Sequence, residues 1–108
     1  MSVKETKMID GLAYDEENKR ICLLLADSLD WKNEYKHLKL LQDKLNTYAY
    51  YVQSKQYEKQ YSDKEILQAL IEIHFKYDIS ETVEKFLQVA QDNFGEAGIL
   101  IECHISEA

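Results

Sequence analysis

The strictest pattern in the chain is a period of two that runs from Leu67 to Asp78. Every residue of one parity is apolar, whereas the residues of the other parity are polar except for Leu70. Successive side chains of a β-strand point to opposite faces of its sheet, so this alternation predicts a strand with one buried and one wet face. A fold built on such a strand needs a covering layer on one side of its sheet only.

Three further segments predict strands. Residues 8–15 and 20–27 flank the polar run EENK and predict a β-hairpin. The second of them, RICLLLAD, is apolar on both faces, which is typical of a central strand or of one whose second face is covered. The segment 99–105 alternates again, with odd residues, Cys103 among them, expected to point inward and even residues outward.

Two segments predict amphipathic helices. The first begins after Asp30 as the N-cap, and we place His37 and Lys44 on its solvent side. The second begins after Ser80 and ends at Gly98, which suits a left-handed backbone. The apolar stripe of the first helix consists of Trp31, Tyr35, Leu38, Leu41, Leu45, Tyr48 and Val52.

The predicted order of elements is β-β-α-β-α-β. Strand–helix–strand units make right-handed crossovers onto parallel strands, and two of them advancing in one direction place both helices on one side. We therefore predict an α+β or α/β two-layer sandwich, with a four-stranded mixed sheet in the order 1-2-3-4 and strand 1 antiparallel at the edge. The 108 residues suit a single domain over 1–108, with 1–7 expected to be a flexible N-terminus.

Composition narrows the classes of partner. The net charge is −7 and Arg20 is the only arginine, so we expect no nucleic-acid partner and no anionic membrane partner. The N-terminal sequence lacks the apolar core of a signal peptide, and no apolar run reaches the roughly 20 residues of a membrane span. We therefore expect a cytoplasmic protein in which Cys22 and Cys103 are reduced and buried.

The repeated Glu-x-His of IEIH and IECH raises the question of a metal site. If the third and fourth strands are parallel neighbours in this register, Glu72 lies beside Glu102 and His74 lies beside His104. These four residues are weak candidates for metal ligands, since zinc accepts imidazole and carboxylate. The alternative is a solvated ladder of partly complementary charges, and we expect no cofactor.

Two groups of residues predict an interaction surface. Leu24, Leu70 and Leu100 point to the side of the sheet without helices, where an apolar patch with a polar rim is typical of an association site. The alternative is that they are scattered exposed leucines. The most aromatic stretch of the chain contributes Tyr50, Tyr57 and Tyr61, which suit an interface or, alternatively, cap the edge of the core.

Several runs of the sequence resemble a known family. They are LADSLDWKNEYKHLKLLQDKLNTYAYYVQSKQY, then IEIHFKYD and then AGILIEC, and they cover most of the chain. They resemble a family of small bacterial proteins that contain an uncharacterised domain of unknown function. The resemblance implies a bacterial, cytoplasmic, single-domain protein and brings no catalytic residue with it.

Motifs of catalysis are missing from the sequence. It has no glycine-rich phosphate loop, no G-x-S-x-G, no H-E-x-x-H and no paired C-x-x-C. Asp10, Asp27 and Cys22 could act in catalysis only with partners that the sequence does not reveal. We therefore predict a non-enzymatic protein-interaction module with an unknown protein partner or a second copy of itself. The alternatives are a small-ligand or metal sensor, an inhibitor or immunity protein against a basic toxin and, least favoured, an enzyme.

Overall fold

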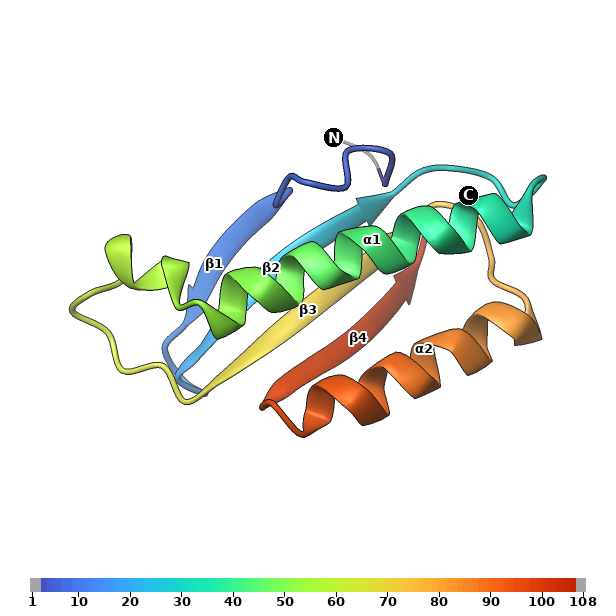
Figure 1. Cartoon of the computed structure of the whole chain (residues 1–108). Helices are drawn as coiled ribbons and strands as arrows, with labels where there is room; N and C mark the ends of the chain where they lie inside the picture. The colour runs from blue at the N-terminus through green and yellow to red at the C-terminus, as the bar shows by residue number, and fades with distance from the viewer. Residues whose placement is uncertain (1–2, 107–108) are drawn as a thin grey trace.

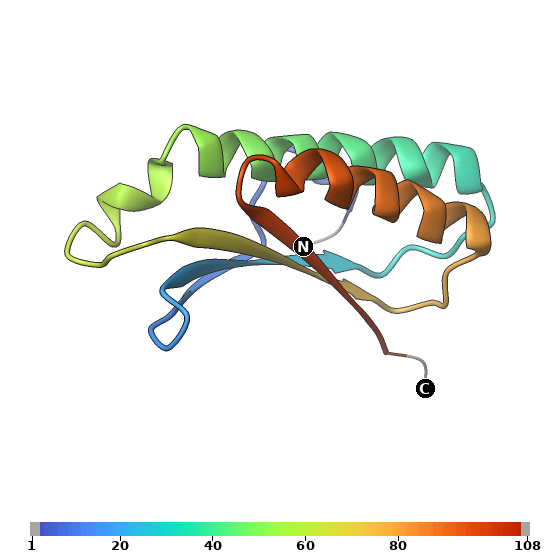
Figure 2. The ribbon, with the colours of Figure 1, turned by 90° about the horizontal axis from the view of Figure 1, so that it is seen from below.

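The computed structural model describes residues 3–106, which form four strands and two α-helices in the predicted order (Figure 1). The strands are β1 Gly11–Asp15, β2 Arg20–Asp27, β3 Gln68–Phe75 and β4 Ile99–Ile105. The helices are α1 Glu34–Gln53 and α2 Glu81–Gly95, and a short 3₁₀ helix, η1, covers Gln56–Lys59. Both α-helices lie on one face of the sheet and leave its other face uncovered (Figure 2).

The sheet has the predicted order β1-β2-β3-β4. β1 is antiparallel to β2, whereas β2, β3 and β4 are mutually parallel. The predicted register is also confirmed, since Glu72 pairs with Glu102 and His74 pairs with His104. The chain is therefore an α+β fold with a mixed, open sheet and a single layer of helices.

The core lies between the sheet and the two helices. It is built from alternate residues of the three parallel strands, such as Leu23 and Ile71, and from the inner face of α1, where Leu41 is fully buried. The N-terminal segment 1–7, predicted to be flexible, has residues 1–2 outside the described part of the chain, and its Val3 is fully buried in this core. The segment before β1 thus closes one side of the core.

Helix α1 differs from its prediction in start and in orientation. Asp30 does not cap it; its carboxylate accepts a hydrogen bond from the Lys32 amide in a preceding turn, and the N-cap is Asn33. Tyr35, predicted to be in the apolar stripe, is 81% exposed. The predicted apolar stripe was wrong because the buried face of the helix includes two polar residues. The buried residues of α1 are His37, Leu41, Lys44, Leu45, Tyr48 and Ala49.

Helix α2 begins as predicted but ends earlier, since its last residue is Gly95 and its C-cap is Glu96 instead of Gly98. The Ser80 hydroxyl caps the helix by accepting from the Val83 amide at 3.3 Å. Gly98 has a φ of +78°, in the left-handed region that glycine adopts without a steric penalty.

We expect Gly98→Ala to lower the free energy of unfolding by about 1 kcal/mol, because a Cβ disfavours the left-handed backbone. A Cβ at this position would meet no atom within 4 Å, so the cost comes from the backbone alone. Urea denaturation followed by circular dichroism measures it. Equal midpoints for the two proteins would show that this turn relaxes at no cost.

Candidate functional site

The uncovered sheet face carries the three predicted leucines on adjacent strands. Leu70 lies between Cys22 and Leu100 in the register, and Leu24 lies further along β2. Leu70 is only 3% exposed, whereas Leu24 is half-buried and Leu100 is 39% exposed. The apolar patch is therefore narrower than predicted, because the neighbours of Leu70 on the two flanking strands shield it.

A ladder of Glu and His side chains lies beside these leucines on the same face. The rings of His74 and His104 stack, with centroids 4.7 Å apart and planes inclined by 11°. His104 Nε2 lies 2.6 Å from a Glu102 carboxylate oxygen, and His74 Nε2 lies 3.7 Å from a Glu72 oxygen. Each strand thus contributes one carboxylate–imidazole pair to a partly exposed cluster.

Three residues of this ladder could share an ion. Glu72, Glu102 and His104 each offer a ligand atom, and these atoms all lie within 4.8 Å of one another. Such ligands suit zinc, but strong sites also hold their ligands through partners behind them. Here the carboxylates and imidazoles stand on an open sheet face, and exposed acidic groups are common without an ion. Together with His74, they stay weak metal candidates.

Neither cysteine is fully buried, contrary to the prediction. Cys22 is half-buried on the uncovered face, and Cys103 is exposed near the end of β4. Cys103 does belong to the inward parity and lines a hollow beside α2, but Glu102 to Ile105 are all exposed, so the helices cover this half of the strand only in part. Desolvation raises the pKa of the Cys22 thiol, which disfavours the nucleophilic thiolate.

The three predicted tyrosines do not join the leucines. Tyr50 is 67% exposed on α1, in the helical layer. Tyr57 and Tyr61 are partly buried against the core near η1, and the Tyr61 ring lies 6.0 Å from the Tyr14 ring. Tyr57 and Tyr61 thus cap an edge of the core, which was the alternative to a role in an interface.

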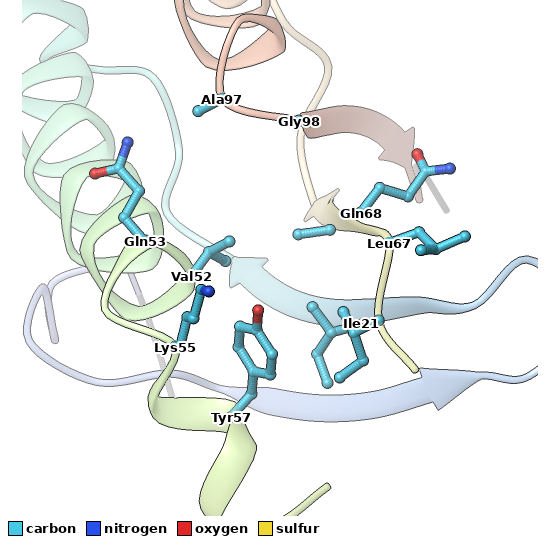
Figure 3. A pocket seen from close by; sticks show the side chains of 11 residues that line it. Ile21, Val52, Gln53, Lys55, Tyr57, Leu67, Gln68, Ala97 and Gly98 are labelled. Atoms are coloured by element: carbon cyan, nitrogen blue, oxygen red, sulfur yellow. The ribbon is translucent and has the colours of Figure 1, made fainter. Parts of the chain in front are cut away.

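A pocket of about 270 Å³ lies at this end of the molecule. It is lined by the C-terminal end of α1, by Lys55 and Tyr57, and by the starts of β2, β3 and β4 (Figure 3). Sites for drug-sized ligands and cofactors usually exceed about 300 Å³ and converge several polar groups on the ligand. The lining combines apolar side chains with a few polar ones, Gln53, Lys55, Tyr57 and Gln68, and it points to no particular chemistry.

Sequence reasoning missed a buried pair between Asp27 and His37. Asp27 ends β2 and faces the helices, and its Oδ2 lies 2.6 Å from His37 Nε2. The two side chains are 0% and 1% exposed, respectively. The prediction of a surface His37 was wrong, because its ring packs under Trp31, with ring centroids 3.5 Å apart.

This pair has the composition of a catalytic dyad but not its geometry. His37 Nδ1 lies 3.0 Å from the Asp30 carbonyl, so both ring nitrogens already have acceptors within the protein. A general base needs a free nitrogen within reach of a substrate proton. Burial raises the pKa of Asp27, and the hydrogen bond from His37 partly opposes that shift. The pair therefore fastens the start of α1 to the end of β2.

A second buried network joins Asp10 and Lys44. Lys44 Nζ lies 2.8 Å from Asp10 Oδ1, and both side chains are fully buried. The other Asp10 oxygen accepts from the Ala26 amide at 2.8 Å. The Tyr48 hydroxyl donates to the Leu24 carbonyl and accepts from the Asp10 amide at 2.9 Å. The network thus connects α1, β2 and the segment before β1.

A positional signal for these residues exists in the sequence. His37, Leu41, Lys44 and Tyr48 follow one another at spacings of four, three and four, the spacing of a single helical face. Because Lys and His are mostly exposed, a reading by residue type assigns them to the solvent side. Spacing alone would have placed all four residues on the same buried face of the helix.

The chain matches a known protein family. Residues 1–107 match a family described as "Family of unknown function (DUF6572)". The chain belongs to this family. No curated protein and no solved structure matches the chain. Among residues 3–106, no helix of this family member combines the length and the apolarity that a bilayer crossing requires.

Proposed function

We propose that the chain is a non-enzymatic protein-interaction module that docks a partner protein on its uncovered sheet face. The observation that carries the proposal is the one-sided architecture, with both helices on one face and Leu24 and Leu100 accessible on the other. Apolar side chains with a polar rim on an open face are typical of association sites. Here the rim consists of Glu72, Glu102 and the two stacked histidines.

The charge of the chain indicates the chemistry of the partner. The net charge is −7, and carboxylates border the leucines. Acidic surfaces speed encounter with basic ones and disfavour acidic competitors. The proposed partner is therefore a basic protein with an apolar contact surface. Inhibition of a basic toxin is the sharpest form of this proposal, and the cytosol of a bacterium is its proposed setting.

The chemistry of the buried groups supports a non-enzymatic role. His37 has both ring nitrogens engaged inside the protein. The raised pKa of Cys22 opposes its use as a nucleophile. The two buried ion pairs, Asp27–His37 and Asp10–Lys44, hold elements of the fold together, which supports the uncovered face as the surface used for function.

We expect Leu100→Glu to reduce capture of the basic partner at least tenfold, because it places a charge in the apolar part of the proposed contact, where it must lose its water. The immobilised chain is incubated with lysate of the native organism at low salt, and the captured protein is identified by mass spectrometry and quantified. The matched control is Val89→Glu, which adds the same charge at a 59% exposed position on α2. Equal capture by both variants would rule out the uncovered face as the binding surface.

A further inference from the structure

The outer edge of β4 is the starting point of a further inference, which does not depend on the proposed function. The Ala69 amide donates to the Gly98 carbonyl at 3.1 Å, and the Ser106 amide donates to the Phe75 carbonyl at 2.8 Å. Alternate residues of a parallel strand bond to the same neighbour, so the even residues of β4 bond to β3. The odd residues Ile99, Ile101, Cys103 and Ile105 therefore direct their backbone groups outward.

The first half of this outer edge is closed by a side chain. Gln91 of α2 donates from Nε2 to the Ile99 carbonyl at 3.2 Å, and its Oε1 accepts from the Ile101 amide at 2.7 Å. The amide of Gln91 thus takes the place of a neighbouring strand. Beyond it, the Ile101 carbonyl, both backbone groups of Cys103 and the Ile105 amide have no hydrogen-bond partner within residues 3–106.

The second half of β4 has little of the usual protection of an edge strand. Figure 2 shows that β4 runs away from the helical layer toward its C-terminal end. Ile105 is 43% exposed and Cys103 is also exposed. Edge strands are normally protected by charged side chains, above all lysine, by proline, by a bulge or by a cover. Residues 99–105 contain no lysine or proline, and Glu102 is the acidic residue among them. The strand is therefore open to pairing with another strand.

We propose that β4 pairs antiparallel with β4 of a second copy of this chain, about a two-fold axis at Cys103. Outward residues must face outward residues, so the axis can pass through residue 102, 103 or 104. An axis at 102 sets Glu102 against itself, which is unfavourable, and an axis at 104 sets His104 against itself. The axis at Cys103 sets Glu102 against His104 of the second copy, twice by symmetry.

The same register also satisfies the backbone and the apolar side chains. Each Cys103 amide donates to the Cys103 carbonyl of the other copy, and each Ile105 amide donates to the Ile101 carbonyl of the other copy. These bonds use every group that Gln91 leaves free. Ile101 then lies across from Ile105 of the second copy. The two sheets become continuous, and their uncovered faces adjoin on one side.

Sedimentation of the full chain over a range of concentrations tests the proposal. One strand pair buries less than the standard interface of about 1,600 Å², so we expect a reversible, weak dimer. His104→Glu places two pairs of like charges across the axis and should weaken association about tenfold. The double variant Glu102→Lys/His104→Glu sets opposite charges against each other across the axis and should restore association. Val89→Glu adds a negative charge on the side of α2 that borders α1, away from this edge, and serves as the control.

The position of the axis is tested by cross-linking. Residues facing each other in a hydrogen-bonded antiparallel pair have Cα atoms about 5.5 Å apart, within the range of a disulfide. In the Cys22→Ser variant, diamide should oxidise the two Cys103 thiols to an intermolecular disulfide and be reduced itself. His104→Glu should slow this reaction, whereas Val89→Glu should not. A chain that sediments as a monomer at every concentration overturns the proposal, as does a dimer that is insensitive to His104→Glu.

Discussion

Replacing Lys44 with Met will lower the free energy of unfolding by about 3–5 kcal/mol, a large part of the 5–15 kcal/mol typical of a domain. The Lys44 ammonium and the Asp10 carboxylate are both fully buried and 2.8 Å apart. Met keeps the volume of the aliphatic stem and removes the charge, so the loss of packing is small. The cost arises because an ionised carboxylate is left without a counter-charge in the core.

A double variant separates this explanation from a general loss of packing. In Lys44→Met/Asp10→Asn the charge of Asp10 is also removed, while the Asn carbonyl can still accept from the Ala26 amide. We expect the double variant to regain more than half of the lost stability, which a double-mutant cycle reports as a coupling energy. Guanidinium denaturation followed by circular dichroism measures all four proteins. A loss below about 1 kcal/mol in the single variant would contradict the proposed role of the buried pair.

The strands could be predicted from the sequence because their signal is local. The bounds of β2 and β4 agree with the prediction, and the register that pairs His74 with His104 follows from one repeated motif. The placement of both helices on one side of the sheet follows from two strands that each have polar residues at alternate positions. These features depend on side-chain alternation and on the handedness of crossovers, both of which are visible in one sequence.

The buried polar pairs could not be predicted in the same way. Lys44 lies 34 residues from Asp10, and His37 lies 10 residues from Asp27. Charged residues are rarely buried unless they are paired, and a sequence does not show which distant partner is available. The same holds for Gln91, whose hydrogen bonds to the β4 edge depend on how α2 packs. Tertiary contacts therefore determine whether each of these polar residues is buried and which partner it has.

Replacing His37 with Leu will destabilise the protein by about 3 kcal/mol at neutral pH, because it leaves the buried Asp27 carboxylate without its main partner. The Leu29 amide, 3.1 Å from Asp27 Oδ1, is then the hydrogen bond that remains to that side chain. The hydrogen bond and charge of His37 now lower the pKa of Asp27 against the effect of burial. Their removal lets burial raise the pKa of Asp27 further.

The dependence of this loss on pH identifies its cause. A carboxyl group whose pKa is higher in the folded than in the unfolded state, where it is about 3.9, contributes most stability below that lower value. The contribution is lost as the pH rises through the folded pKa. His37→Leu should therefore be less stable than Asp27→Asn/His37→Leu at neutral pH, and acidification toward about pH 4 should stabilise it relative to that double variant. Both variants lack His37, so titration of the imidazole cancels from the comparison. A difference in stability that stays constant across this pH range would mean that the pKa of Asp27 is the same in the folded and unfolded variant, and that the loss comes from packing under Trp31.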